Sequence, residues 1–334
     1  MRILKILILT ILLFSFSPFQ AFADKSDDTL VIAFSREITN LDYHYGTKTE
    51  YLILGDMIDD SLFYVENENL TYAPSLASDF NVVDDVTLDV NLRQGVKFHD
   101  GSEMTSDDVV YTYNFIVTND KNRRHKKLAS WLKSIEKTGK YSVRFNLNSP
   151  YANLFNDLYR IKIRKNGIMG TDGNWDDNAQ ATSLNGLGPY KVISFDPGVE
   201  VVLERNESYF GGPKGNPAIK NLIIRSIPDM GTQQAELMSG GIHWMYNVKK
   251  DVGEAMAKTG KADYQIGPSL RIGFLVLDAG GYSGEGNPIT KLDVRRAMNH
   301  AINRESIAKN LIGGPAKAIP VSYTHLTLPT KVTV

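Results

Sequence analysis

The sequence predicts an α/β protein with more than one packed unit, for three reasons. The chain has 334 residues, whereas a single hydrophobic core stops growing at roughly 250–300 residues. Residues 86–92 alternate apolar and polar side chains, which is typical of a half-buried strand. Residues 54–62 and 294–302 instead carry apolar side chains at helical spacing. Strand and helix patterns alternate in this way along most of the chain.

The first elements follow from local patterns near the amino end. The apolar run Thr29–Ser35 predicts a buried strand, and the polar Ser35–Asp42 segment predicts a loop that leaves it. The next pattern predicts a helix over residues 54–62. Its acidic residues lie away from the apolar face: Asp56, Asp59 and Asp60.

A turn and a helix start are expected after the strand at residues 86–92. Asp100-Gly101 has turn chemistry. Thr105, followed by Asp108 three residues later, predicts a helix start of the capping-box type, with acids where the helix dipole favours them. Tyr141–Leu147 is expected to form a further strand.

The middle of the chain predicts a hairpin, a strand and a helix. Pro189–Phe195 and Val199–Glu204 read as two strands, and the Asp-Pro-Gly segment between them suits a type I or II turn. Leu222–Ile227 is expected to be a strand. Asp229 can then cap a helix that runs to Ser239, where two glycines end it.

Towards the carboxyl end the patterns predict one strand and two helices. The apolar run Leu270–Leu277 favours a strand, and a glycine-rich segment follows it. Asp293 is the expected cap of the next helix, and a second helix is expected from Asn303.

Composition excludes several classes of function. The chain is 42% hydrophobic with a formal net charge of −1, an ordinary globular balance that offers no basic face for nucleic acid. It contains no cysteine, which excludes disulfides, thiol catalysis and cysteine-ligated metals.

The amino terminus predicts export. Arg2 and Lys5 form a charged region, Ile6–Phe14 an apolar one, and Ala21-Phe22-Ala23 a signal-peptidase site. The apolar run is short of the ~20 residues that span a bilayer, so we expect cleavage before Asp24. With no cysteine for lipid attachment, the expected location is the periplasm, free of the membrane.

No catalytic constellation stands out. His99-Asp100 invites a metal-phosphohydrolase interpretation, but the other histidines lack ligand spacing, so we expect His99 to be a hydrogen-bonded turn residue. No G-x-S-x-G elbow and no phosphate-binding P-loop occurs in the sequence. We therefore expect a non-enzyme with neither metal nor cofactor, and an exported hydrolase is the distant alternative.

Five motifs share an order along the chain. They are Leu41-Asp42; Tyr72–Phe80; Val96–Asn114, which contains Lys-Phe-His-Asp-Gly; Gly186–Lys191 with Leu203–Phe210; and Leu292–Arg304. Their order resembles that of the family 5 extracellular solute-binding proteins, the dipeptide, oligopeptide and nickel receptors of ABC importers.

The resemblance implies a two-lobed, type II periplasmic binding protein fold with an extra subdomain and an incomplete second lobe. The implied divisions are a signal peptide at 1–23, a first lobe at 24–54 and 185–278, an extra subdomain at 55–184, the start of a second lobe at 279–320, and a non-native tail at 321–334. That tail matches nothing expected next in the family and resembles adaptor read-through at the end of a fragmentary reading frame.

The resemblance also implies a function and a site. The ligand is expected to be a short peptide, with a nickel chelate, haem, an opine or an oligosaccharide as alternatives. The monomeric receptor would close on it and dock on inner-membrane ABC permease subunits. The expected ligand contacts are Glu37, where the family carries a carboxylate near the peptide's amino end, and Arg36, Ile38, Thr39, Tyr43 and Tyr246.

Overall fold

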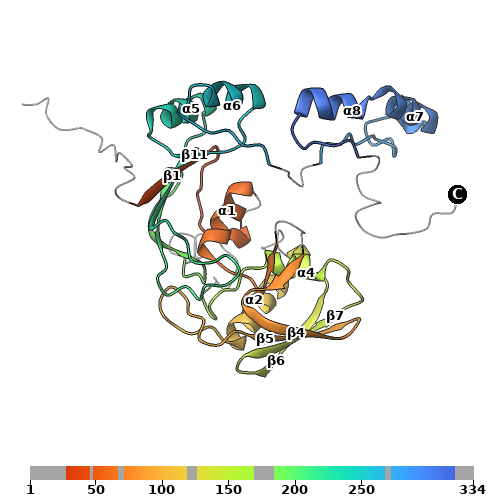
Figure 1. Ribbon diagram of the computed structural model, residues 1–334. Coiled ribbons are helices and arrows are strands. Elements are labelled where there is room, and N and C mark those ends of the chain that lie inside the picture. Colours follow the sequence, from red (N-terminus) through yellow and green to blue (C-terminus); the bar gives the residue numbers. More distant parts are fainter. Residues whose placement is uncertain are drawn as a thin grey trace, which may run out of the picture. The chain divides into compact units, whose positions relative to one another are not determined.

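The computed structural model describes residues 28–45, 48–66, 71–118, 126–168, 184–267 and 272–319 (Figure 1). The predictions for residues 1–23 and 321–334 lie outside this range. The chain divides into two compact units between Asn247 and Val248, and each is considered separately. The finer domain division inferred from the sequence stays a prediction.

A five-stranded sheet of order β11-β1-β10-β9-β8 organises the first unit. Its strands are β1 (Thr29–Phe34), β8 (Tyr190–Asp196), β9 (Glu200–Arg205), β10 (Asn221–Ser226) and β11 (Trp244–Met245). β1 runs parallel to β10 and β11, whereas β9 is antiparallel to both of its neighbours. The carboxyl ends of β11, β1 and β10 therefore share one edge of the sheet.

Helix α1 (Thr49–Ile58) packs against one face of this sheet. Leu54 and Ile58 are fully buried there, beside Phe34 of β1. Helix α5 (Met230–Ser239) begins as expected, because the Asp229 carboxylate accepts the Thr232 N–H, and it ends at Gly240, whose backbone is left-handed. The hairpin of β8 and β9 is also confirmed: Val199 N–H donates to the Asp196 carbonyl, and Gly198 takes the positive φ that a type II turn requires.

A second, antiparallel sheet of order β4-β5-β7-β6 has a core of its own. Its strands are β4 (Ala77–Asp84), β5 (Thr87–Leu92), β6 (Leu132–Gly139) and β7 (Ser142–Leu147). Helix α2 (Ser106–Thr118) packs on β6 and β7, and α4 (Leu154–Arg160) lies beside the hairpin of β2 (Phe63–Val65) and β3 (Tyr72–Pro74). Short 3-10 turns occur at η2 (Tyr43–Tyr45) and η3 (Lys127–Ala129). The strands predicted at residues 86–92 and 141–147 are confirmed as β5 and β7.

The capping box at the start of α2 is confirmed. Asp108 accepts hydrogen bonds from the N–H (2.7 Å) and the hydroxyl (3.2 Å) of Thr105, and the Thr105 hydroxyl accepts the Asp107 N–H. These contacts satisfy helix N–H groups that have no partner within the helix.

The regular elements in the described part of the second unit are all helices. Its elements are α6 (Lys250–Ala257), η6 (Pro288–Thr290), α7 (Leu292–Ala301), α8 (Arg304–Ser306) and η7 (Ile307–Ile312), the last a π-helix. No residue of α7 is buried, so its apolar side chains contact little of the described chain. None of the helices in the described residues is both long and apolar enough to cross a membrane.

Three expectations need correction, and one strand was not expected. Helix α1 ends at Ile58, so Ser61 and Leu62 lie beyond it. The described part of the predicted strand, residues 272–277, is not a strand, because it has no pairing partner in the described chain. Lys291 rather than Asp293 occupies the cap position of α7, and Asp293 lies in the first turn. Strand β11 lies at residues 244–245, where the sequence patterns above indicated no element, and it pairs with β1.

Two glycines of the Gly186–Lys191 motif allow the chain to touch the end of α1. Gly188 N–H donates to the Ile58 carbonyl at 2.8 Å. A Cβ on Gly188 would lie 2.6 Å from the Asp59 nitrogen, and one on Gly186 would lie 2.6 Å from an Asp59 carboxylate oxygen. Both distances are shorter than real contacts, so this motif is constrained by packing.

We therefore predict that Gly188→Ala destabilises the first unit by about 1–3 kcal/mol, the usual cost of overpacking. Urea unfolding followed by tyrosine and tryptophan fluorescence measures the change. Gly267→Ala is the matched control, since a Cβ there meets nothing within 4 Å. Equal stability of the two variants would show that the backbone contact at Ile58 is loose.

Candidate ligand-binding site

The carboxyl edge of β11, β1 and β10 gathers three segments that are distant in sequence. The loop at residues 35–42 leaves β1, the turn before α5 leaves β10, and Tyr246 leaves β11. Ile227 N–H donates to the Phe34 carbonyl (2.8 Å), and Gly198 N–H donates to the Ile38 carbonyl (2.7 Å). Ligands of open α/β sheets bind outside the carboxyl ends of strands, so this edge is the candidate site.

The predicted contact residues differ in exposure. Arg36, Glu37 and Thr39 project from the loop as exposed side chains. Ile38 lies between two of these exposed residues but is itself 1% exposed, because its side chain packs in the core beneath the sheet edge. Tyr43 is also buried, at 2% exposed. Burial raises the pKa of the Tyr43 phenol above its usual value. The structure thus brings three predicted residues to the surface of the loop and places two in the interior.

Tyr246 belongs to an aromatic group at the same edge. Its ring stacks on Trp244 with centroids 5.6 Å apart and meets Phe34 edge-on at 5.9 Å. Its hydroxyl donates to the carboxylate of Glu50, which is 3% exposed in the first turn of α1. The sequence patterns revealed neither Trp244 nor Glu50. A two-residue strand has too short a pattern to reveal that Trp244 and Tyr246 share a face.

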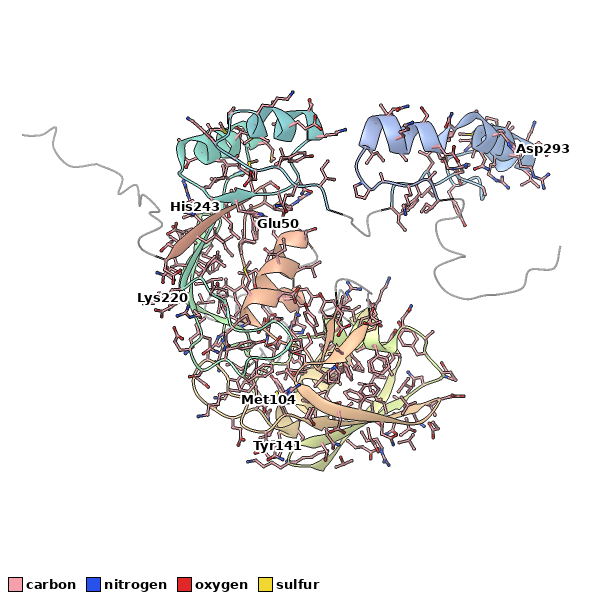
Figure 2. All side chains as sticks on the ribbon, viewed as in Figure 1. Glu50, Met104, Tyr141, Lys220, His243 and Asp293 are labelled. Atoms are coloured by element: carbon pink, nitrogen blue, oxygen red, sulfur yellow. The ribbon has the colours of Figure 1, made fainter. Side chains whose placement is uncertain are left out.

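His243 fixes the position of this aromatic group. The backbone N–H of His243 donates to the Val31 carbonyl (2.7 Å), and its ring Nδ1 accepts the backbone N–H of Val31 (3.0 Å). Nδ1 must therefore be unprotonated in this arrangement. Both Glu50 and His243 are marked in Figure 2, on α1 and beside the β1–β11 pair.

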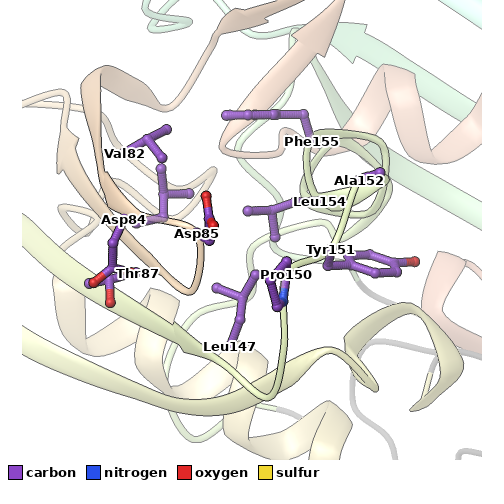
Figure 3. Close-up of a pocket in the computed structure, with 11 residues that line it drawn as sticks. Val82, Asp84, Asp85, Thr87, Leu147, Pro150, Tyr151, Ala152, Leu154 and Phe155 are labelled. Carbon is purple, nitrogen blue, oxygen red and sulfur yellow. The ribbon is translucent and has the colours of Figure 1, made fainter. Parts of the chain in front are cut away.

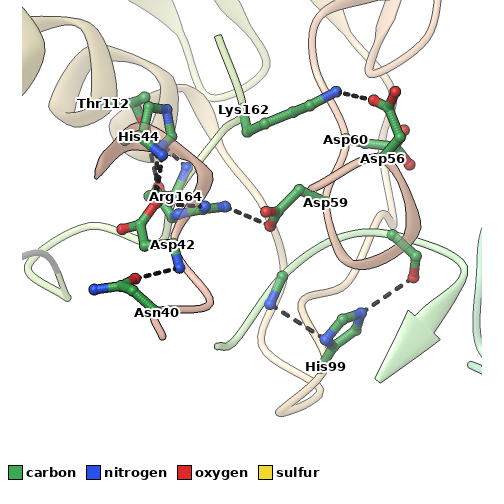
Figure 4. Close-up of polar contacts among 12 residues, drawn as sticks. Asn40, Asp42, His44, Asp56, Asp59, Asp60, His99, Thr112, Lys162 and Arg164 are labelled. Atoms are coloured by element: carbon green, nitrogen blue, oxygen red, sulfur yellow. Dashed lines mark hydrogen bonds and ion pairs between the residues drawn. The ribbon is translucent and has the colours of Figure 1, made fainter. Parts of the chain in front are cut away.

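A buried ion-pair network holds the end of the 35–42 loop that is farther along the chain from β1 (Figure 4). Arg164 is 0% exposed and contacts two carboxylates, that of Asp42 at 2.9 Å and that of Asp59. Asp42 also accepts from the backbone N–H of His44 at 2.9 Å and lies 3.1 Å from its Nδ1. Thr112 of α2 completes the group: its hydroxyl accepts the Arg164 N–H (2.9 Å) and donates to the Arg164 carbonyl (3.2 Å).

The charges in this network are set by burial and by each other. Burial alone would raise the pKa of Asp42, but Arg164 and His44 outweigh it and hold that pKa below its usual value. Burial lowers the pKa of His44 even though Asp42 opposes the shift. Asp42 is therefore charged and His44 neutral near pH 7.

A second group of charges satisfies the end of α1. The Lys214 ammonium donates to the carbonyls of Asp56 and Asp59, each at 2.7 Å, and pairs with the Asp60 carboxylate at 2.7 Å. Lys162 donates to the Asp56 carboxylate at 2.5 Å. The acids at the end of α1 thus pair with the buried Lys162 and the partly buried Lys214, whereas the sequence pattern showed only that they avoid the apolar face.

His99 is confirmed as a hydrogen-bonded turn residue. Gly186 N–H donates to its Nδ1 (3.2 Å), and its Nε2 lies 3.1 Å from the Gly188 carbonyl. Both ring nitrogens therefore join the Val96–Asn114 motif to the Gly186–Lys191 motif. Within the described parts of the chain, no group of histidine and acidic residues has the arrangement of a metal site.

Residues 71–329 match the family described as "Bacterial extracellular solute-binding proteins, family 5 Middle". This match covers more than half of the chain, so the chain belongs to this solute-binding family. The match confirms the resemblance seen in the ordered motifs.

Several characterised relatives are similar over much of the chain. The oligopeptide-binding protein AppA of Bacillus subtilis is 28% identical over 307 residues, which is 90% of this chain and 52% of AppA. The glutathione-binding protein GsiB of Salmonella typhimurium is 22% identical over 303 residues, 90% of this chain and 57% of GsiB. The chain spans about half the length of the curated relatives it matches.

Solved structures agree on the fold. The structure of B. subtilis AppA in complex with a nonapeptide superposes with a TM-score of 0.62 at 30% identity, covering 70% of this chain and 45% of AppA. NikA from Brucella suis in complex with Fe(III)-EDTA gives 0.71 at 24% identity, covering 84% of this chain and 56% of NikA. The two-lobed fold class is therefore confirmed, and the described chain accounts for about half of it.

Arg164→Met should destabilise the first unit by about 3–5 kcal/mol, because it leaves two carboxylates buried without their cation. It should also reverse the dependence of stability on pH. In the unsubstituted protein the lowered pKa of Asp42 makes this carboxylate stabilising above its unfolded value of 3.8, and that contribution is lost as pH falls. Without Arg164, burial would raise the pKa, so stability should fall as pH rises from 4 to 6.

Urea unfolding at several pH values tests both statements. Arg144→Met is the control, because Arg144 makes a comparable ion pair with Asp89 at a partly exposed position, its side chain 41% exposed. The hydrogen bond from Arg144 lowers the pKa of Asp89, so this variant should weaken the pH dependence of the unsubstituted protein but keep its direction. If Arg164→Met also keeps it, the buried network does not set the pH response.

Proposed function

We propose that this protein is a solute-binding receptor that captures short peptides and delivers them to an ABC transporter permease. The observation that carries the proposal is the sheet edge at which Arg36, Glu37 and Thr39 project from the loop after β1 and Tyr246 follows β11, in a chain of the solute-binding family. Relatives named as oligopeptide-binding and glutathione-binding proteins support peptide-like ligands.

The chemistry of the edge suits a peptide. Glu37 supplies an exposed carboxylate for an amino group, and Arg36 supplies an exposed cation for a carboxylate. Trp244, 43% exposed and stacked on Tyr246, offers an apolar surface for a side chain. Backbone groups of the loop can add hydrogen bonds that read the main chain of a peptide and leave its side chains free.

Further parts of the proposal follow from the family. The protein is exported to the periplasm without lipid attachment, acts as a monomer, has no catalytic activity, and closes on its ligand through differential affinity for the closed state. The first lobe comprises residues 24–54 and 185–278, and residues 55–184 form the extra subdomain. In this proposal Ile38 and Tyr43 support the loop from the interior, and Arg36, Glu37, Thr39 and Tyr246 touch the ligand.

A nickel chelate is the second candidate ligand. NikZ from Campylobacter jejuni in complex with Ni(L-His) superposes with a TM-score of 0.63 at 25% identity. An exposed Arg36 and Glu37 could pair with the carboxylate and amino groups of bound histidine. Titration with Ni–histidine beside peptides separates the two candidates.

Glu37→Ala should weaken peptide binding about tenfold or more, since a charge-assisted hydrogen bond contributes roughly 1.5–3 kcal/mol. NMR titration with trialanine measures this, because chemical shifts report even millimolar affinities. The control is Glu204→Ala, a glutamate of β9 paired in register with Asn221 at the opposite edge of the sheet.

The control should bind as the unsubstituted protein does. Affinities within twofold for Glu37→Ala as well would remove Glu37 from the site. If NMR chemical-shift changes appear only with Ni–histidine and not with peptide, the ligand is a nickel chelate and the peptide proposal is wrong.

A further inference from the structure

A separate cavity opens in the second sheet, away from the carboxyl edge of β1. Its volume is about 410 Å³, within the range of small-molecule pockets. It lies between the β4–β5 hairpin on one side and the segment that leads into α4 on the other (Figure 3). The lining residues are Val82, Asp84, Asp85, Thr87, Leu88, Leu147, Pro150, Tyr151, Ala152, Leu154 and Phe155.

The cavity exists because the sheet extends beyond the helix that covers it. Val82 and Phe80 of β4 pair in register with Leu88 and Val90 of β5, so all four side chains point to the core face. Leu88 and Val90 are each 1% exposed, whereas Val82 is 57% and Phe80 is 38% exposed. Helix α2 packs on β6 and β7, and β4 is left as the open end of the core.

Two aromatic side chains, those of Tyr151 and Phe155, line the cavity on its α4 side. The ring of Phe155 lies 5.1 Å from that of Phe80 and 5.0 Å from that of Phe63, and it stacks on Tyr72 at 6.5 Å. Ring faces attract cations as well as apolar groups. This wall therefore suits an apolar body that carries a positive charge.

The charge of the cavity has one sign. Asp84 and Asp85, at the turn between β4 and β5, are the charged members of the lining, and no lysine, arginine or histidine is found among the described residues that line it. Asp84 accepts the Val86 N–H at 2.9 Å. Asp85 makes no hydrogen bond or ion pair within the described chain, so its carboxylate is available to a ligand.

We propose that this cavity binds a small organic cation. The apolar body of this ligand fills the open end of the core, and its amino group pairs with Asp84 and Asp85. The site is independent of the peptide site proposed at the carboxyl edge of β1. It combines apolar burial, which gives affinity, with two carboxylates that select the sign of the ligand's charge.

Three probes of one shape test the proposal: phenethylamine, 2-phenylethanol and 3-phenylpropionate, which are cationic, neutral and anionic at pH 7. NMR titration of the full chain should give phenethylamine an affinity at least about tenfold above the alcohol, and the acid should bind weakest. The shifts should map to residues 82–88 and 147–155.

Variants locate the site and its charge. Asp84→Asn with Asp85→Asn should abolish the preference for the amine, and Asn at 84 keeps an acceptor for the Val86 N–H. Asp79→Asn is the matched control, an aspartate of β4 outside the lining whose carboxylate accepts from Asn91 and Ser78. Ala152→Trp, which fills the cavity from an exposed position, should prevent binding of all three probes.

Several results would overturn the proposal. They are equal affinity for the three probes, absence of binding by all of them, or unchanged phenethylamine binding in the Ala152→Trp variant. Sedimentation equilibrium adds a further outcome: if the unsubstituted chain is a dimer and Ala152→Trp is a monomer, the cavity is a self-association surface and the proposal fails.

Discussion

The contact on which the first unit most depends is the buried ion pair of Arg164 with Asp42 and Asp59. Asp42 ends the loop that follows β1, and Asp59 follows the last residue of α1, so one guanidinium ties the site loop to the helix that covers the sheet. Thr112 adds α2 to the same group. Burying three charges costs desolvation energy that packing alone would not cost. In return, the arrangement fixes the geometry, because the two carboxylates keep their ion pairs only while both lie against the Arg164 guanidinium.

That geometry positions the candidate site from several directions. The loop is fixed at one end by β1 and at the other by Asp42, and Gly198 of the β8–β9 turn holds its middle through the Ile38 carbonyl. The exposure of residues 36–39 then follows: Ile38 fills the core, and Arg36, Glu37 and Thr39 face outward. On the other side of β1, His243 aligns β11 and so sets the Tyr246 ring against Glu50.

Local patterns predicted much of the fold because their causes are local. Alternation gave β5 and β7, the Thr105–Asp108 pair gave the start of α2, and the Asp-Pro-Gly turn gave the β8–β9 hairpin. The errors arose where contacts between residues distant in sequence determine the local structure. Strand β11 has two residues and exists only because β1 pairs with it. Asp59 is buried because Arg164, 105 positions later, meets it. Likewise, Glu37 could be proposed from the family resemblance, whereas Trp244 and Glu50 emerge only when β11 and α1 are placed against β1.

Photo-crosslinking tests most directly the claim that ligand binds at the carboxyl edge of β11, β1 and β10. A tripeptide with a benzophenone side chain would be irradiated with the protein, and the attachment sites read by mass spectrometry, with and without excess unlabelled peptide. The account predicts competitor-sensitive labelling of residues 36–39 and 244–246. Labelling confined to other segments, such as the cavity wall at Val82 and Phe155, would contradict it.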